Sequence, residues 1–493
     1  MTPRLSLATL ERLPRAVAPR VDPCALPVGI VHLGIGAFHR AHQAVYTEDA
    51  IAAGGGDWGI CGVTQRSEAV VEQLAPQDGL YTLAQRDGAG ERLRVIGAVR
   101  ELLWARAEAD EVLDRIAAPQ TRIVSLTVTE KGYHHDPATN RLRLDSPEIA
   151  ADLSEGGART AVGQIVAGLA RRRDAGGGPL TVLCCDNLPD NGHVLRELVS
   201  DFAARRTGAN GLGEWIESNV RFPSTMVDRI TPATTADDRA RIASELGARD
   251  DGAVVTEPFT QWVIEDDFAA GRPEWERAGA IMTGDVRPYE QMKLRMLNGA
   301  HSTLAYLAQL ADDELVSDAI APGTPFAALL ESLMKDDVAP TLDVPDGFDL
   351  DAYRAELLTR FANPALRHRT LQIAMDGSQK LPMRLIGTIR DRRRAGAEPV
   401  FASLGVAAWM RFVSARRSDG GRQLAVDDPL EGEIADRLAG REDAAPVVDA
   451  LLSMTQIFNP ELAADETWRG LLADLLESLI RDGAQRTARR IAG

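Results

Sequence analysis

The stretch GIVHLGIGAFHR, residues 29–40, decides the fold of this 493-residue chain. It starts as a β-like apolar run and breaks into Gly34-Ile-Gly36, and we predict a helical stretch over residues 41–53. A glycine pair between a strand and a helix is typical of a dinucleotide-binding unit. The first glycine permits the tight turn and the second lets the backbone approach a pyrophosphate, which the helix N-terminus attracts. His39 stands where the usual pattern has a third glycine. Taken alone, the segment could also be a plain strand-to-helix turn.

Short apolar runs continue to alternate with longer amphipathic segments beyond this turn. We predict strands over residues 58–63, 122–128 and 180–185, and a helix over residues 161–173. This alternation indicates βα units and a parallel sheet. From about Tyr289, leucine- and alanine-rich stretches predict helices over residues 292–310, 325–335, 352–361, 406–414 and 467–488. The predicted fold is therefore α/β: a Rossmann-type dinucleotide-binding domain, residues 1–286, followed by a mainly α-helical C-terminal domain, residues 287–493.

The bulk composition, with 45% hydrophobic and 26% charged residues, is that of a globular protein. A net charge of −17 argues against nucleic acid or an anionic membrane as the main partner, although a local basic pocket could take a small anion. No apolar run approaches ~18 residues, and the N-terminus lacks the apolar core of a signal peptide. The four cysteines, with Cys184 and Cys185 adjacent and predicted to face opposite sides of a strand, give neither a disulfide framework nor zinc spacing. We expect a cytoplasmic, metal-free protein that acts on a small molecule.

The second predicted strand ends near Thr64 and is followed by Arg66 and Glu68. An acid at this place commonly accepts the ribose hydroxyls of NAD, and its charge repels the 2′-phosphate of NADP. Glu68 therefore favours NAD, whereas the neighbouring Arg66 keeps NADP possible. Phe38, on the glycine turn, is expected to contact the same cofactor.

Lysine is rare in this chain: of 55 basic residues only Lys131, Lys293, Lys335 and Lys380 are lysine. Arginine serves equally well in ion pairs, but it does not give up its proton near neutral pH, whereas the amine of a buried lysine can. A chain that uses arginine nearly everywhere keeps lysine mainly where an amine is needed.

Lys293 lies in KLRMLNGAH, residues 293–301, together with Asn298 and His301. On an α-helix successive residues turn by ~100°, so the three side chains fall within an arc of ~140° and can line one wall of a cleft. Reduction of a carbonyl needs one group that supplies a proton to the nascent alkoxide and others that stabilise its charge. An amine, an amide and an imidazole suit these tasks. The spacing alone would also fit a surface lysine beside a helix-capping Asn-Gly.

Polar residues follow several predicted strands, at the end where α/β sheets gather their ligands. Asn187 belongs to CDNLPDNG, directly after one strand, and Asp228 ends another apolar run. Thr129 and Glu130 follow a third run, and we expect them at the cofactor. The clustering predicts a shared cleft.

Seven ordered segments together resemble the long-chain mannitol-type dehydrogenases, a zinc-independent family of polyol and sugar-acid oxidoreductases. The resemblance covers nearly the whole chain and rests on HLGIGAFHRAHQAVY, SLTVTEKGY, CDNLPDNG, MVDRITP, EPFTQWVIED, KLRMLNGAH and MDGSQKLP. The family shares the departure at the third glycine, so His39 does not count against a dinucleotide site. The resemblance implies NAD as cofactor and a small polyol or sugar acid as substrate.

The resemblance also implies roles for particular side chains. Lys293 would be the general acid/base, and Asn187 with Asn298 would form the oxyanion hole. His301 and Asp228 would contact substrate hydroxyls. Two further residues complete the implied site: Lys380, which would also reach the substrate, and Glu290, which would lie near the catalytic lysine.

One position separates this chain from the family members that oxidise mannitol. Those members carry an arginine eight residues before the lysine that matches Lys380, and here that place is Gln372. Residues 366–384 and the lysine of TEKGY resemble instead the members that reduce the ketone of D-fructuronate to D-mannonate with NADH. That substrate carries a carboxylate, which requires a cationic partner. The candidates for this partner are Arg384, Lys131, Arg369 and Lys380. Interconversion of D-mannitol and D-fructose, or of another polyol or sugar acid, is the alternative.

Overall fold

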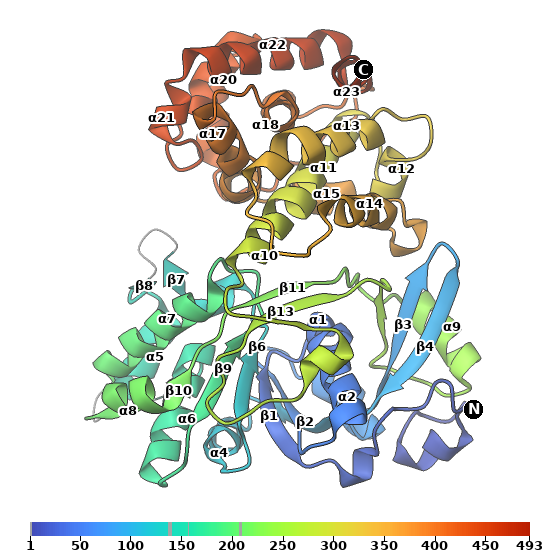
Figure 1. Ribbon diagram of the computed structural model, residues 1–493, viewed down its shortest axis with the longest axis vertical. Coiled ribbons are helices and arrows are strands. Elements are labelled where there is room, and N and C mark those ends of the chain that lie inside the picture. Colours follow the sequence, from blue (N-terminus) through green and yellow to red (C-terminus); the bar gives the residue numbers. More distant parts are fainter. Residues whose placement is uncertain (1, 137–140, 156, 207–209) are drawn as a thin grey trace. The chain divides into compact units, whose positions relative to one another are not determined.

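The computed structural model describes residues 2–136, 141–155, 157–206 and 210–493. The chain divides into two compact units, Met1–Arg287 and Pro288–Gly493. The first unit is α/β and the second is mainly helical, which confirms the predicted fold class. Figure 1 draws the first unit from blue to yellow-green and the second from yellow to red.

Within the described part of the first unit, six strands form a parallel sheet in the order β10-β9-β6-β1-β2-β5. Their bounds are β1 Val28–Leu33, β2 Gly59–Thr64, β5 Val99–Trp104, β6 Ile123–Leu126, β9 Leu180–Cys184 and β10 Val220–Arg221. The strand order runs from β1 to β2 on one side and from β1 to β6 on the other, so it reverses at β1. Open α/β sheets bind their ligands at such a reversal, beyond the carboxyl ends of the strands. The glycine turn after β1 lies at this place.

Hydrophobic cores cover both faces of the sheet, because side chains alternate along each strand. Val31 and Leu33 belong to one core and Ile30 to the other. Cys184 and Cys185 likewise belong to different cores, which confirms that they face opposite sides. The helices of the first core include α4 (Ala109–Ala117), α6 (Ala161–Asp174), α7 (Asn191–Arg205) and α8 (Leu212–Asn219), and α2 (Gln43–Gly54) packs in the second.

The helix predicted over residues 41–53 is in fact two helices. α1 (Ala37–Ala41) starts directly after the glycine turn, and α2 follows a break at His42, which has φ −122° and ψ −87°. The prediction started too late because His39 and Arg40 look like surface residues in the sequence. Both are buried.

The strand that ends at Asp228 is not part of the parallel sheet. β11 (Thr225–Asp228) pairs antiparallel with β13 (Gln261–Glu265), and β13 pairs with β14 (Ile281–Thr283). Trp262 of β13 packs in the same core as α2. The prediction of one row of parallel strand ends is therefore wrong for Asp228, because an apolar run signals burial and does not identify the strand's partner.

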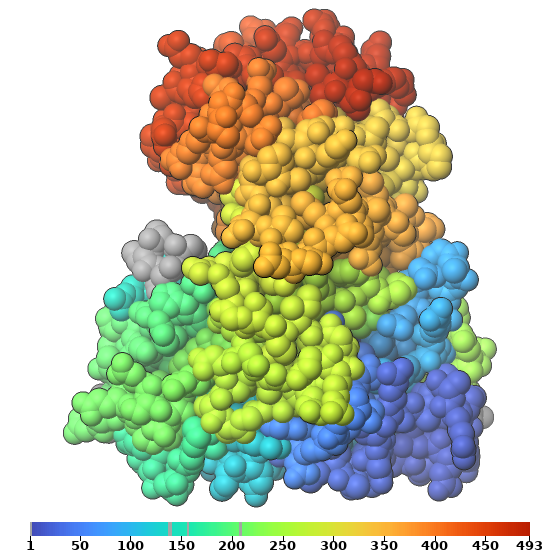
Figure 2. Space-filling view, in the orientation of Figure 1, coloured from blue at the N-terminus to red at the C-terminus, as the bar shows by residue number. Residues whose placement is uncertain are grey.

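A small lobe is built on the hairpin of β3 (Tyr81–Asp87) and β4 (Gly90–Ile96), which β12 (Val254–Thr256) extends. Leu5, near the N-terminus, shares its core with α9 (Ala236–Leu246). In Figure 2 the dark-blue N-terminal residues lie beside the light-blue hairpin at the surface.

The second unit contains the predicted helices with one correction. Its longer helices are α11 Gly299–Leu310, α14 Leu350–Phe361, α18 Val400–Ala415 and α22 Glu466–Asp482. Its shorter helices are α12 Val316–Ala319, α13 Phe326–Ser332, α15 Thr370–Ala374, α16 Gly377–Leu381, α17 Gly387–Arg394, α19 Glu431–Leu438, α20 Ala444–Leu452, α21 Pro460–Ala463 and α23 Ala484–Ala492. The single helix predicted over residues 467–488 is wrong, because Gly483 takes φ +79° and ends α22 before α23 begins. No helix in the described ranges is long and apolar enough to cross a membrane.

Candidate active site

The turn after β1 depends on Gly34, whose backbone lies in the left-handed region at φ +100°. Its amide donates to the Val63 carbonyl at 2.8 Å, and its carbonyl accepts the Thr127 hydroxyl at 2.8 Å. A Cβ at Gly34 would lie 2.2 Å from the Thr127 carbonyl oxygen. Glycine is required here, because the φ angle and the neighbouring strand both exclude a side chain.

Gly36 is different, because none of the residues that the structure describes requires a glycine there. Its φ of −80° and ψ of −172° are extended values that any residue adopts. A Cβ at Gly36 would meet only the Gly34 carbonyl oxygen, at an ordinary 3.8 Å. The protein leaves the space over this exposed backbone open, which fits the close approach of a dinucleotide pyrophosphate.

The side chain at the third glycine position has a structural role. His39 is buried, and its ring stacks on that of His32 with the centroids 3.4 Å apart. His32 in turn bonds the hydroxyls of Ser125 and Thr127, both at 2.8 Å. Burial lowers the pKa of His32 to about 3 and the pKa of His39 well below its ordinary value, so both rings are neutral at neutral pH. The pair ties α1 to the ends of β1 and β6.

Glu68 and Arg66 lie exposed on the loop between β2 and α3 (Ala69–Leu74). This loop follows the strand next to β1, where the ribose-binding acid of a Rossmann unit stands. Phe38 is half-buried on α1, and its ring stacks on His42 with the centroids 5.1 Å apart. Their contacts with the cofactor remain predictions.

A half-buried carboxylate, for which the sequence predicts no role, joins two loops of the predicted site. Asp186 accepts hydrogen bonds from the amides of Val128 and Thr129, at 2.8 and 3.0 Å, and from the Tyr133 hydroxyl at 2.6 Å. The loops after β6 and β9 are thereby tied together. The next residue, Asn187, is exposed. The only sequence signal for Asp186 was its place after a buried strand.

The other predicted residues of the first unit lie at strand ends. Thr129 and Glu130 are exposed directly after β6. Lys131 is exposed on the 3₁₀ turn Glu130–Tyr133. Asp228 is buried at the end of β11, only 5% exposed.

Lys293, Asn298 and His301 lie on one continuous helical run of the second unit, but this run is not a regular α-helix. Between α10 (Arg287–Met292) and α11, the segment Lys293–Asn298 is a π-helix. The ~140° arc predicted from α-helical spacing is therefore wrong. A π turn closes i→i+5 hydrogen bonds, so the lysine and the asparagine five residues later come toward one face, and such segments are frequent at functional sites.

The π segment is held by a buried arginine and carries a buried lysine. The Arg295 guanidinium donates to the Asp391 carboxylate at 2.6 Å and to the Thr341 carbonyl at 3.2 Å. Lys293 is 8% exposed, and Glu290, one turn earlier on α10, is half-buried. A desolvated lysine amine is the kind of group that exchanges protons near neutral pH.

His301 lies in an aromatic environment. Its ring stacks on Phe361 with centroids 4.3 Å apart, and His368 meets it edge-on at 5.3 Å. Burial lowers the pKa of His301 well below its ordinary value, and His368, Arg360 and Arg384 lower it further. Its Nε2 is buried and makes no hydrogen bond to any residue that the structure describes. A neutral imidazole with an unbonded nitrogen can bind a substrate hydroxyl.

Arg384 acts electrostatically on this imidazole. It belongs to the π segment Pro382–Ile386, and its guanidinium donates to the Ser302 hydroxyl at 3.0 Å. Its positive charge is one of the causes that keep His301 neutral.

The other basic candidates of this unit have different surroundings. The Lys380 amine donates to the carbonyls of Ile373 and Met375, at 3.3 and 2.5 Å, and so caps the end of α15. Arg369 is exposed at a pocket of about 440 Å³ whose other walls are mostly carboxylates. Gln372 is exposed on α15.

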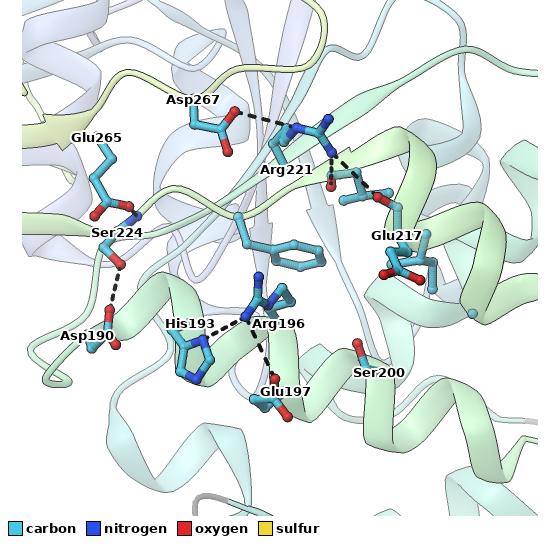
Figure 3. A pocket seen from close by; sticks show the side chains of 14 residues that line it. Asp190, His193, Arg196, Glu197, Ser200, Glu217, Arg221, Ser224, Glu265 and Asp267 are labelled. Atoms are coloured by element: carbon cyan, nitrogen blue, oxygen red, sulfur yellow. Dashed lines mark hydrogen bonds and ion pairs between the residues drawn. The ribbon is translucent and has the colours of Figure 1, made fainter. Parts of the chain in front are cut away.

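A larger pocket, of about 840 Å³, lies beside α7, α8 and β10. Figure 3 shows that its charged side chains face one another: Arg221 lies 3.5 Å from Asp267, and Arg196 bonds His193 at 2.9 Å. The predicted site residues are not among its lining. Across the described residues, no group of three or more His, Cys, Asp or Glu side chains is arranged to hold a metal ion.

Comparisons with known proteins match both units. The model of the mannitol dehydrogenase Rossmann domain matches residues 28–277, and that of the mannitol dehydrogenase C-terminal domain matches residues 285–479.

Individual relatives match over the full length. An uncharacterized oxidoreductase of Escherichia coli, YeiQ, is 44% identical over 95% of both chains. The D-mannonate oxidoreductase of the same organism is 44% identical over 95% of this chain and 96% of its own. The structure of Pseudomonas fluorescens mannitol 2-dehydrogenase, a ternary complex with NAD and D-mannitol, is 36% identical and superposes with a TM-score of 0.87 over 99% of both chains.

Proposed function

The chain belongs to the mannitol dehydrogenase family, and from this premise we propose that it is an NAD-dependent reductase that converts the ketone of D-fructuronate to the secondary alcohol of D-mannonate. The open space over Gly36 and the exposed Glu68 support a site for NAD. When bound, NADH supplies the hydride for the ketone carbon.

The chain's own residues handle the proton and the charge. As the carbonyl carbon gains a hydride, its oxygen becomes an alkoxide that needs donors and then a proton. The amides of Asn187 and Asn298 are the donors, and the Lys293 ammonium delivers the proton to that oxygen. His301, neutral at working pH, bonds a substrate hydroxyl. In the reverse direction the neutral Lys293 amine accepts the alcohol proton.

The observation that carries the choice of substrate is the position of Arg384. Its guanidinium donates to the hydroxyl of Ser302, the residue after His301, and its charge acts on the imidazole that is proposed to bind substrate. Gln372 stands where the mannitol-oxidising members have an arginine. A guanidinium beside the substrate hydroxyls suits a carboxylate, and a charge-assisted bond of this kind contributes roughly 1.5–3 kcal/mol, or about 10–150-fold in specificity. Lys131, exposed at the end of β6, is the second candidate.

Reduction of D-fructose to D-mannitol is the second candidate function. The fold similarity to a mannitol 2-dehydrogenase, 36% identical over 99% of the chain, favours it. Both reactions use the same hydride and proton transfers, so the difference lies at the far end of the sugar, where one substrate has a carboxylate and the other a hydroxymethyl group.

NADH oxidation with D-fructuronate and D-fructose in parallel tests the proposal. We expect a clear preference for D-fructuronate, and Arg384→Gln should raise its KM about 10–150-fold while barely changing any activity on D-fructose. A preference of the wild type for fructose would refute the uronate proposal. A preference for fructuronate that survives unchanged in Arg384→Gln would refute only the assignment of Arg384 and turn attention to Lys131.

A further inference from the structure

We propose that Asp186 is a positioning residue: its carboxylate holds Thr129 in a strained backbone conformation and so fixes the Thr129-Glu130 loop and Asn187 relative to each other. The cofactor and oxyanion roles of these two partners rest on the proposed function. The geometry that links them does not.

Thr129 has a backbone conformation that its side chain disfavours. Its φ of +67° and ψ of 159° lie in a region that is essentially reserved for glycine. A β-branched residue at positive φ is a rare outlier. Such strain persists only where surrounding contacts impose it, and it concentrates at functional sites.

Hydrogen bonds hold the peptide planes on both sides of Thr129, and Asp186 supplies the acceptor on the first side. One Asp186 oxygen accepts the Thr129 amide at 3.0 Å, and the other accepts the Val128 amide at 2.8 Å and the Tyr133 hydroxyl at 2.6 Å. The Thr129 amide belongs to the peptide plane before Thr129, which Asp186 fixes, and the Thr129 carbonyl belongs to the plane after it, where it accepts the Gly132 amide at 2.9 Å. The φ and ψ angles of Thr129 set the orientation of these two planes relative to each other, so the two bonds together hold its unusual conformation. Burial raises the pKa of Asp186, while the three donors favour its ionised form.

The same residue fixes the adjacent loop. Asp186 directly precedes Asn187, so the three bonds that anchor its side chain also restrain the backbone of the proposed oxyanion donor. Asn191 restrains the same backbone, because its side-chain amide nitrogen donates to the Asp186 carbonyl at 2.9 Å and to the Thr225 carbonyl at 2.8 Å. The loops after β6 and β9 therefore move as one piece as long as the carboxylate is intact.

A double-mutant cycle tests this role. Asp186→Asn keeps the size of the side chain but replaces one carboxylate oxygen with an amide NH2 group. While the remaining oxygen accepts Val128 and Tyr133, the Thr129 amide loses its acceptor. NADH affinity should fall about 5- to 150-fold, the range that corresponds to releasing one strained residue. In a Thr129→Gly background the same Asp186→Asn change should cost less than about 3-fold, because glycine adopts this conformation without a restraint. Equal losses in both backgrounds would refute the proposal and leave Asp186 a purely structural residue.

Tyr133→Phe is the matched control. It removes one of the three bonds but neither amide contact, so its effect on NADH affinity should be the same with Thr129 present or replaced by glycine. A background-dependent effect as large as that of Asp186→Asn would contradict the specific link to the Thr129 amide.

A stability measurement keeps the proposal testable if Asp186→Asn does not fold. Thr129→Gly should be more resistant to urea than Thr129→Ala, because alanine retains the Cβ that this conformation disfavours. An alanine variant at least as stable as the glycine variant would show that the backbone is not strained and refute the proposal. A wild-type chain that binds no nicotinamide nucleotide would instead refute the proposed function, and the comparison of glycine with alanine would still decide on the strain.

Discussion

Replacing each of the two glycines of the turn by alanine should separate folding from cofactor binding. At Gly34 a methyl group would be forced into φ +100° and to 2.2 Å from the Thr127 carbonyl oxygen. The backbone strain costs ~1–3 kcal/mol, and the overpacking against β6 costs a further ~1–3 kcal/mol. Gly34→Ala should therefore lower the free energy of unfolding of the first unit by about 2–6 kcal/mol, a large part of the stability of a domain.

Gly36→Ala should leave folding intact. The backbone there is already extended, and the nearest atom to the new methyl lies 3.8 Å away. Removing a glycine also restricts the unfolded chain, so the variant should be as stable as the wild type or more stable by ~0.4–1 kcal/mol. The methyl would instead occupy the space left for the pyrophosphate. Loss of one charge-assisted backbone contact should weaken NADH binding about 10–150-fold.

Two measurements on both variants check this. Urea unfolding, monitored through hydrogen exchange of the amides in β1, β2 and β6, reports on the first unit alone. Calorimetric titration gives the NADH affinity. Equal destabilisation by the two substitutions would show that Gly36 is packed and not open. Wild-type NADH affinity in a folded Gly36→Ala variant would mean that the turn does not hold the pyrophosphate.

Three further outcomes are expected. Lys293→Ala should lower turnover by roughly 10²–10⁴-fold with NADH binding retained. Lys335 is an exposed lysine of the π segment Leu333–Val338, and Lys335→Ala should leave turnover unchanged. Near-normal turnover without Lys293 would remove it from the mechanism. Glu68→Lys should improve the use of NADPH relative to NADH, because the acid that repels the 2′-phosphate becomes a cation, and an unchanged ratio of the two kcat/KM values would place Glu68 outside the cofactor site. Burial raises the pKa of Asp337 to about 6, so the free energy of unfolding of the wild type should decline as pH rises from about 4 through 6. Asp337→Asn, which can still accept the Ala402 amide, should lack this part of the decline. Urea unfolding at both ends of that pH range measures the difference, and equal pH dependence of the two proteins would contradict the assignment.

The sequence by itself determined the local elements and the fold class. Alternation of apolar residues decides which face of a strand is buried, and a glycine pair between strand and helix specifies the turn, because these properties depend on neighbours within a few residues. For the same reason β1, β2, β6 and β9, the glycine turn and the helical nature of the second unit were predicted. The spacing of Lys293, Asn298 and His301 was informative because all three lie on one helical run.

The tertiary structure decided everything that depends on partners distant in the sequence. The π turn at Lys293–Asn298 is such a case, since Arg295 anchors it to Asp391, 96 residues away. Likewise, no local signal shows that a threonine after β6 takes a positive φ, because the carboxylate that binds its amide comes from the loop after another strand, 57 residues further on. Local periodicity fixes what each segment can form, but hydrogen bonds between segments fix which side chains meet, and those bonds exist only once the sheet has brought the strand ends together.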